Sequence, residues 1–455
     1  MEPAKKSFFT KDKTFYRTLF PLLITVALQN LVAYSVNMAD NIMLGSYSQA
    51  ALSGAATVNQ IFFLVQQFAI SVGNALVALS AQYWGQRRTE PIRAITATAL
   101  KLGAAVSVIL IALCEIIPMP ILRIFTPDAA ILAQGQSYLR LVVWSFLLFV
   151  VTQTLMAALR AVETVKISFW VSLVSLVVNV CINYLLIFGK LGCPELGIRG
   201  AAIGTLIARA VELAIVVLYL VKWDKKLHLF QKGLFKRDPV LSRDYRKVYL
   251  PIMCATVLWG VSVPMQTAIL GHLSADAIAA NSVATTFYQY LKVVVVAMSS
   301  TSAVMIGTAI GRGNMDRIKS DARTLSCIDV VIGLILGVAL VLLRGPLLTL
   351  YDLTPSATVM ASNLIAIMGV IMVGMSYQMP VSFGIIQGGG DGAFTMKMNL
   401  ISTWLIVMPL SFAAAFWWKL PVEWVVVIIQ SDQIFKCLPT FIHFRKYKWM
   451  KKLTH

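Results

Sequence analysis

The chain has 455 residues, of which 58% are hydrophobic and only 13% are charged. Soluble domains contain about 25% charged residues, so this composition excludes an ordinary soluble protein. The 39 basic and 20 acidic residues give a formal net charge of +19. The basic residues stand in short segments between long apolar runs instead of gathering in one domain, and we therefore expect no nucleic-acid partner.

Twelve apolar runs predict transmembrane helices, because a helix of about 20 residues crosses the apolar core of a bilayer. The second and eighth runs are too long for one crossing, so we expect them to tilt or to project from the membrane. Pro21 and Pro251 lie near the starts of the first and seventh runs, where a proline suits the first helical turn. The runs lie at approximately 18–44, 50–84, 94–117, 128–157, 167–188, 199–221, 247–270, 276–310, 323–343, 356–386, 396–417 and 422–442.

The basic residues alternate from one connection to the next. Most of them precede the first run, follow the last run or lie in every second connection, with Lys436 counted at the C-terminal end. Cytoplasmic segments of membrane proteins carry the excess of lysine and arginine, so both termini are expected in the cytoplasm. The sequence therefore predicts a multi-pass protein of the plasma (cytoplasmic or inner) membrane, surrounded by membrane lipid.

The two halves of the chain repeat one plan. Segments 44–92 and 270–318 align without a gap at an offset of 226, and Gly85 and Gly311 are among the positions that they share. A duplicated membrane domain is typical of transporters, whose site lies between or within the halves. We expect an N-terminal lobe at 1–222, a basic cytoplasmic linker at 223–246, a C-terminal lobe at 247–442 and a basic tail at 443–455.

Asp40 is the clearest ionisable residue inside an apolar run. Because the first run leaves the cytoplasm, Asp40 is expected in the outer half of the membrane, where a lone carboxylate is costly. At the same depth the fifth run carries Asn179 and Asn183, whose i, i+4 spacing places both amides on one helix face, and the sixth run carries Thr205. These side chains predict a site for a hard cation such as Na⁺, or a hydrogen-bonded cage around a protonatable carboxyl. In the alternative structural interpretation, Asp40 caps a helix end and the asparagines hold helices together.

Lys292 lies midway along the eighth run, too far from either end to snorkel. Either it binds anionic substrate groups or titrates as a coupling site, or it belongs to an ion pair or lines the lumen without a special role. Aromatic and methionine side chains supply adaptable contacts for varied ligands, although packing explains them equally well. The tentative cavity residues are Tyr34, Met38, Phe62, Gln66 and Lys292. Four other ionisable residues receive structural interpretations, a salt bridge for Arg209 with Glu212, and solvation or pairing for Asp329 and Asp432.

No motif points to catalysis. The glycine-rich segment 387–391 lacks the Lys-Ser/Thr ending of a phosphate loop and follows an apolar run instead of a strand. The six cysteines show no spacing typical of a metal site. We therefore expect no enzyme, no cofactor other than a coupling ion (H⁺ or Na⁺), and no metal other than Na⁺ at the Asp40 site.

Three segments make the sequence similar to the multidrug and toxic compound extrusion (MATE) family of secondary antiporters over nearly its whole length. They are NMADNIMLG at 37–45, SAQYWGQRR at 80–88 and NVCINYLLIFGKLGCPELGIRGAAIGT at 179–205. The resemblance implies an all-α integral membrane protein with twelve transmembrane helices in two six-helix lobes, V-shaped around a central cavity. It also implies export of amphipathic drugs or toxic metabolites driven by inward H⁺ or Na⁺. The positions that match the cation site of the family are Asp40, Asn179, Asn183 and Thr205.

Two departures from the family bear on coupling and substrate. Many members have an aspartate where this chain has Asn183, so one carboxylate is left at the site. The carboxylates that one branch carries in the C-terminal lobe fall here on Gly260 and Ser376, whereas Lys292 adds a positive charge to that lobe. A cavity with one acidic and one basic group could prefer zwitterions or anions over the amphipathic cations that the family usually exports.

Two other functions stay open from the sequence alone. A lipid-linked oligosaccharide flippase of related fold would favour several cationic residues around a pyrophosphate group, and Lys292 alone fits that expectation. A receptor or scaffold that transports nothing would not need a carboxylate with amides at one depth. Because each chain holds a complete two-lobe unit, we expect a monomer that handles a small-molecule substrate.

Overall fold

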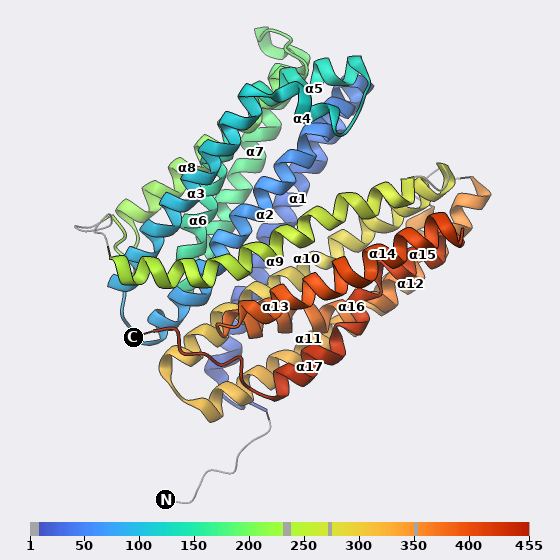
Figure 1. The fold of residues 1–455 in the computed structure, drawn as a ribbon. Coiled ribbons are helices and arrows are strands. Elements are labelled where there is room, and N and C mark those ends of the chain that lie inside the picture. Colours follow the sequence, from blue (N-terminus) through green and yellow to red (C-terminus); the bar gives the residue numbers. More distant parts are fainter. Residues whose placement is uncertain (1–8, 231–237, 272–274, 350–353, 455) are drawn as a thin grey trace, which may run out of the picture. The chain divides into compact units, whose positions relative to one another are not determined.

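Figure 1 shows the computed structural model, which describes residues 9–230, 238–271, 275–349 and 354–454. The described chain is helical and contains no strand, as the apolar runs predict. Part of the predicted linker, residues 231–237, lies outside the described residues. The helices, with 3₁₀ or π segments marked η, are α1 (Lys13–Tyr47), α2 (Gln49–Gly85), α3 (Glu90–Ile116), α4 (Pro118–Arg123), α5 (Ala129–Val142), α6 (Ser145–Ala161), α7 (Lys166–Phe188), η1 (Lys190–Gly192), α8 (Ile198–Lys222), α9 (Pro239–Gly271), α10 (Ala275–Arg312), α11 (Met315–Leu348), α12 (Pro355–Met379), η2 (Pro380–Ile386), α13 (Gly392–Asn399), η3 (Leu400–Val407), α14 (Met408–Phe412), η4 (Ala413–Trp417), α15 (Val422–Gln430), α16 (Asp432–Phe435) and α17 (Cys437–Arg445).

Eleven helices of the described chain are long and apolar enough to cross a membrane. A twelfth span results if α5 and α6, which meet at a 51° bend, count as one broken helix. This count agrees with the twelve predicted runs, and the bent pair covers the fourth of them. Since α2 and α10 contain 37 and 38 residues, the prediction that the second and eighth runs exceed one crossing is confirmed.

The first and seventh spans begin earlier than their prolines suggest. Pro21 and Pro251 lie inside α1 and α9, so the prediction that they occupy the first helical turn is wrong. Asp12 and Asp238 set the helix starts instead, because each accepts hydrogen bonds of 2.8–3.0 Å from backbone N–H groups of the first turn. Such caps satisfy donors that the helix leaves unpaired, and the polar residues before each apolar run are therefore helical too.

The chain forms two compact units. The N unit contains residues 28–80 and 88–249, and the C unit contains residues 1–27, 81–87 and 250–455. The start of α1 therefore belongs with the second half of the chain, where Phe15 and Leu19 pack against Ile306. The start of α9 belongs with the first half in the same way. These units differ from a division at the linker 223–246, because both helices continue past the point where the units divide.

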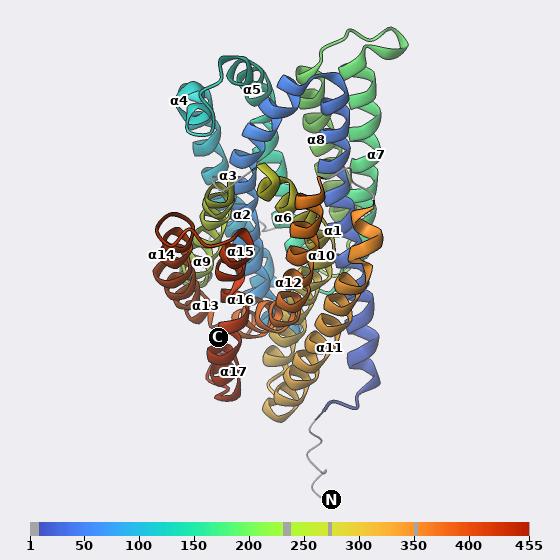
Figure 2. The same cartoon turned by 90° about the vertical axis from the view of Figure 1, so that its right-hand side faces the viewer.

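In the N unit, α8 packs against α7, α5 and α6, and α3 packs against α6. Figures 1 and 2 show α7 and α8 side by side. Apolar side chains of α2, α5 and α6, among them Val58, Leu139 and Phe146, form the core of this unit. The two helices that carry Asn179, Asn183 and Thr205 are thereby fixed to a packed core.

In the C unit, α12 packs against α10 and α11, and Figure 2 shows α11 and α12 side by side. Gly333 of α11 fits so closely on α12 that an added Cβ would lie 2.5 Å from Ser376 Cβ. Regular α-helical bonding gives way to π-helix at η2, η3 and η4. Short π segments inside α-helices are rare and frequently lie at functional sites.

Two equivalent positions of the internal repeat meet in the C unit. Gly85 ends α2 and packs so closely on α10 that an added Cβ would lie 2.9 Å from Gly311 Cα. Glycine permits this approach because it has no side chain to separate the two backbones. The glycines that the repeated segments share therefore serve a close helix–helix contact.

Candidate functional site

The candidate cation site is built on the α7–α8 hairpin. The left-handed conformation of Gly189 (φ 62°) ends α7, and the backbone N–H of Leu196 donates back to Leu186 O at 2.8 Å. Gly200 and Gly204 then let α8 approach α7 closely, since an added Cβ at Gly200 would lie 2.6 Å from the Leu186 backbone. The small-xxx-small spacing of these glycines is typical of tightly packed membrane helices.

Gly204 makes room for Asn183 in particular. An added Cβ at Gly204 would collide with Asn183 Oδ1. Asn183 and Asn179 are both buried, with 0% and 1% of their surface exposed. The Nδ2 of Asn183 donates to Asn179 Oδ1 at 3.3 Å. The predicted i, i+4 pair therefore shares one face of α7, and this face meets the glycine surface of α8.

The structure brings Asp40 to the asparagine pair. Asn183 Nδ2 donates to Asp40 Oδ1 at 2.5 Å, and the Asn179 side chain also interacts with the carboxylate. Asn183 Oδ1 and Thr205 Oγ1 are buried oxygens that make no hydrogen bond within the described chain. The structure therefore joins one carboxylate of α1 and two amides of α7, and α8, which carries Thr205, packs on Asn183 at Gly204.

Two further side chains border this site. Tyr138 of α5, which the sequence reasoning missed, lies next to Thr205 and within electrostatic range of Asp40. Arg209 of α8 forms the predicted salt bridge with Glu212 at 2.7 Å. The charge of Arg209 also acts on Asp40. Arg209 therefore acts on Asp40 as well as on Glu212, and the i, i+3 pairing in the sequence does not indicate this second interaction.

Aromatic rings hold Arg209 in place. Its guanidinium carbon lies 4.8 Å from the ring centroid of Phe149 and 6.0 Å from that of Phe62. A guanidinium at such distances is attracted by the electron-rich ring face. Phe62, proposed from the sequence as a cavity residue, therefore contacts the surroundings of the cation site.

The tentative cavity residues do not form one group. Tyr34 and Met38 of α1 are 40% and 51% exposed, and Gln66 is half-buried on α2. Phe62 packs against two phenylalanines of α6 with ring centroids 5.2–5.7 Å apart. Lys292 belongs to the C unit. A shared role in substrate binding stays a prediction for these five residues.

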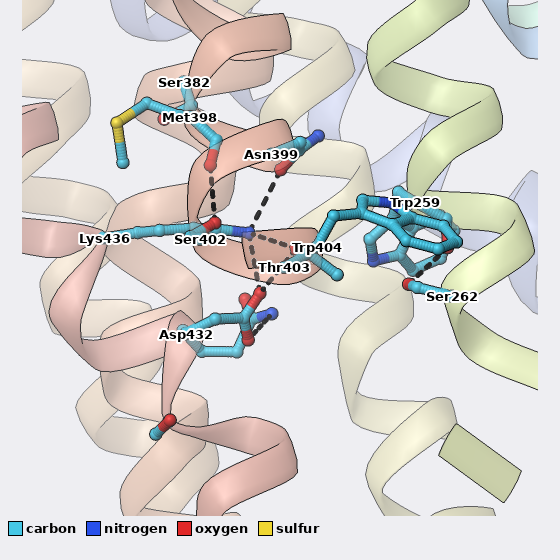
Figure 3. A network of polar contacts seen from close by, with 12 residues as sticks. Trp259, Ser262, Ser382, Met398, Asn399, Ser402, Thr403, Trp404, Asp432 and Lys436 are labelled. Carbon is cyan, nitrogen blue, oxygen red and sulfur yellow. Dashed lines mark hydrogen bonds and ion pairs between the residues drawn. The ribbon is translucent and has the colours of Figure 1, made fainter. Parts of the chain in front are cut away.

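A second polar network lies in the C unit (Figure 3). Lys436 and Asp432 form an ion pair of 2.6 Å. The Nζ of Lys436 also donates to Asn399 Oδ1 at 3.0 Å and to Thr403 Oγ1 at 3.4 Å, and Gln433 donates to the other oxygen of Asp432 at 2.9 Å. The pairing predicted as one alternative for Asp432 is thus confirmed.

The placement of Lys436 among the basic residues of the C-terminal end is wrong. Its side chain is 2% exposed and turns inward, because it stands one helical turn after Asp432 and shares its face. This i, i+4 spacing of opposite charges inside an apolar run was a signal in the sequence that the loop-by-loop charge assignment overlooked.

Lys292 of α10 extends the network. Only 9% of its surface is exposed, and its Nζ lies 4.8 Å from the ring centroid of Trp259. Its charge interacts with Asp432, which Lys436 already neutralises.

Asp329 of α11 departs from the prediction that it is solvated or paired. It is 1% exposed, and neither carboxylate oxygen has a hydrogen-bond partner in the described chain. Gly333, one turn further along α11, packs closely on Ser376 of α12. Asp329 is therefore neither exposed to solvent nor paired within the described chain.

The fold and the site together define a duplicated, polytopic helical membrane protein with a buried carboxylate–amide centre. The sequence model of the MatE family matches residues 25–185 and again residues 251–413. The chain therefore belongs to the MATE family of transporters. The second match begins 226 residues after the first, which confirms the internal repeat at the predicted offset.

Relatives and solved structures agree with this assignment. The chain is 23% identical to the probable multidrug resistance protein NorM of Thermotoga maritima, over 98% of this chain and 96% of that protein. It is 26% identical to the probable NorM of Streptococcus pneumoniae, over 87% and 86%. A variant of the MATE transporter VcmN from Vibrio cholerae has the same fold, with a TM-score of 0.87 and 17% identity over 97% of this chain and 98% of that chain.

Proposed function

We propose that this protein is a secondary antiporter, driven by H⁺ or Na⁺, that exports amphipathic drugs or toxic metabolites. Membership in a transporter family and the multidrug resistance names of the relatives support the export of drugs. The observation that carries cation coupling is the 2.5 Å hydrogen bond from Asn183 to Asp40 inside a membrane-spanning bundle. A carboxylate at such a position needs a cation, a proton or hydrogen-bond donors.

The donor set fits a small cation. Asn183 donates from its Nδ2 to Asp40. Its own Oδ1 and the Oγ1 of Thr205 have no hydrogen-bond partner in the described chain. Carboxylate, amide and hydroxyl oxygens are the ligands that hard cations such as Na⁺ prefer. Alternatively, Asp40 takes up a proton and keeps its hydrogen bonds with the amides. In either case the loaded site has lost the negative charge that faces Arg209.

Loading of Asp40 changes the contact between α1 and the α7–α8 hairpin. The same Asn183 amide contacts Asp40, Asn179 and the glycine surface of α8. A change in its hydrogen bond to Asp40 therefore alters the packing of α1, α7 and α8. An antiporter requires that cation and substrate oppose each other's binding or access, and linkage makes this opposition reciprocal. We place the protein in the plasma membrane with both termini in the cytoplasm, acting as a monomer in the lipid.

The oligosaccharide flippase is not favoured. The family match and the relatives belong to multidrug transporters, and the ammonium of Lys436 is occupied by Asp432, Asn399 and Thr403. Lys292 is then the one lysine of the network that is left for a pyrophosphate group.

Dye transport in inside-out vesicles tests the proposed function. Vesicles from an efflux-deficient host with and without the full chain are given a cationic dye, then an imposed pH gradient or an imposed Na⁺ gradient. We expect chain-dependent dye accumulation with one of the two gradients, and that gradient identifies the coupling ion. Accumulation that is equal in both vesicle preparations under both gradients would contradict coupled export of cationic compounds.

A further inference from the structure

We propose that Lys292, whose charge the Asp432–Lys436 pair leaves unbalanced, binds the anionic group of an aromatic organic anion or zwitterion in the C unit. The inference rests on the proposed export function and names a class of substrate for it. It concerns a site separate from the Asp40 site, because all its residues belong to the C unit.

The charges of this network do not balance. Lys436 satisfies its three N–H donors with Asp432, Asn399 and Thr403 at 2.6–3.4 Å. Asp432 in turn accepts from Lys436 with one oxygen and from Gln433 with the other. Two ammonium groups therefore face one carboxylate whose hydrogen-bonding capacity is largely used. The positive charge of Lys292 is left over.

Lys292 is held where its charge cannot be hydrated easily. It stands near the middle of the 38-residue helix α10, and 9% of its surface is exposed. Asp432 is the one acidic side chain of the described chain that acts on it. A buried ammonium that shares one carboxylate with a second lysine is costly, and an incoming anion that supplies a further counter-charge relieves this cost.

Aromatic rings stand next to the unused charge. The ammonium of Lys292 lies over the Trp259 ring at 4.8 Å. Trp404 reaches from η3 to α9, where its Nε1 donates to Leu258 O at 3.1 Å, directly before Trp259 (Figure 3). Tyr288 lies within electrostatic range of Asp432. Indole and phenol faces stack on flat ligands, so the site suits a carboxylate attached to an aromatic ring.

The ligands of Lys436 come from a segment of altered helix geometry. Asn399 is the last residue of α13 and Thr403 lies in the π segment η3. A π turn displaces side chains relative to a regular helix, and here it brings Thr403 and Trp404 toward the same network. A purely cationic drug would meet the uncompensated positive charge of Lys292 here and be repelled.

Equilibrium binding of radiolabelled 1-naphthoate to the purified full chain tests the proposal. The neutral analogue 1-naphthamide and sodium chloride serve as competitors. We expect saturable naphthoate binding that neither competitor displaces at matched concentration. Displacement by chloride, binding of naphthamide with equal affinity, or no naphthoate binding would overturn the proposal.

Two substitutions separate charge from stacking. Lys292→Met is expected to weaken naphthoate binding about tenfold or more, because it removes the charge-assisted contact, whereas Lys292→Arg retains most of the affinity. Trp259→Leu keeps every charge and is expected to weaken binding through loss of the ring. Lys190→Met in the exposed α7–α8 turn is the matched control. Equal affinity in Lys292→Met and wild type would overturn the proposal.

Cationic-dye transport by the same variants separates this inference from the proposed function. Dye export without naphthoate binding would contradict the anion site and would support the proposed antiporter function. Naphthoate binding that depends on Lys292, without dye export under either gradient, upholds the anion site and contradicts export of cationic compounds.

Discussion

Asn183 of α7 donates a 2.5 Å hydrogen bond to the carboxylate of Asp40 in α1, across 143 positions of sequence. The same side chain contacts Asn179 and fills the space that Gly204 leaves open on α8. One amide therefore links the three helices of the candidate cation site. Its position is set by the hydrogen bond to Asp40 on one side and by the absence of a Cβ at Gly204 on the other.

Substitution of Gly204 tests this dependence without changing a charge. Gly204→Ala places a methyl group against Asn183 Oδ1 and is expected to push the amide away from Asp40. Overpacking of this kind costs about 1–3 kcal/mol. We expect gradient-driven transport to fall by about tenfold or more while the protein still folds. Transport rates in vesicles and thermal unfolding in detergent check both expectations.

Gly45→Ala is the matched control for Gly204→Ala. Gly45 is a helical glycine of the same unit, and its added Cβ would meet only a Leu52 methyl at 3.4 Å, an ordinary contact distance. We expect wild-type transport from Gly45→Ala. Equal transport by Gly204→Ala and Gly45→Ala would show that the position of Asn183 is unimportant.

The Arg209–Glu212 pair is expected to act as a unit in stability. Glu212 is 2% exposed and Arg209 is 17% exposed, so Glu212→Gln leaves a largely buried guanidinium without its partner. Breaking a buried pair from one side costs about 3–5 kcal/mol. The double variant Arg209→Met/Glu212→Gln is expected to be less destabilised than the sum of the two single variants. Additive losses in unfolding temperature would rule out this coupling.

Asp432 and Asp329, two of the buried aspartates of the C unit, should respond oppositely to amide substitution. Asp432→Asn removes the counter-charge of Lys436 and is expected to lower the unfolding temperature markedly. Asp329→Asn is expected to leave it unchanged or to raise it, because the carboxylate of Asp329 has no hydrogen-bond partner in the described chain. A larger loss for Asp329→Asn than for Asp432→Asn would contradict these contacts.

Asp12 gives a pH-dependent contribution outside the membrane-spanning helices. Hydrogen bonds from the Thr14 hydroxyl at 2.6 Å and from its backbone N–H at 2.8 Å, together with the charge of Arg317, lower the pKa of Asp12 below its usual value. A pKa that is lower in the folded state stabilises the fold above the unfolded pKa of about 4, and this stabilisation is lost as the pH falls through the folded value.

Asp12→Asn is therefore expected to lower the unfolding temperature at pH 7 and to have a smaller effect at pH 3, where wild-type Asp12 is increasingly protonated. The effect at pH 7 should also shrink at high salt, since the Asp12 side chain is 32% exposed. The same temperature difference between variant and wild type at both pH values would refute the assigned contribution.

The sequence predicted the span count, the repeat and the Asp40 site because these depend on local patterns. Hydropathy reports the length of each helix, and the depth of Asp40, Asn179, Asn183 and Thr205 follows from counting turns. The packing of Phe15 and Leu19 in the core of the C unit could not be predicted this way. The sequence of a long helix does not indicate which neighbours each of its ends packs against.

The network of the C unit escaped prediction for a related reason. Asp432 and Lys436 show their pairing in their spacing, but Asn399, Thr403 and Lys292 come from other helices, and no sequence pattern brings those together. The burial of Asp329 likewise depends on which helices pack against α11, and its own sequence neighbours do not indicate them.

The central claim is that Asp40 takes up the coupling cation, and transport by Asp40→Asn tests it most directly. Wild type, Asp40→Asn and the exposed control Glu195→Gln are reconstituted in proteoliposomes, and dye uptake is followed under the gradient that drives the wild type. We predict that Asp40→Asn loses gradient-driven uptake while still binding dye, and that Glu195→Gln matches wild type. Uptake by Asp40→Asn at the wild-type rate under the same gradient would contradict the account.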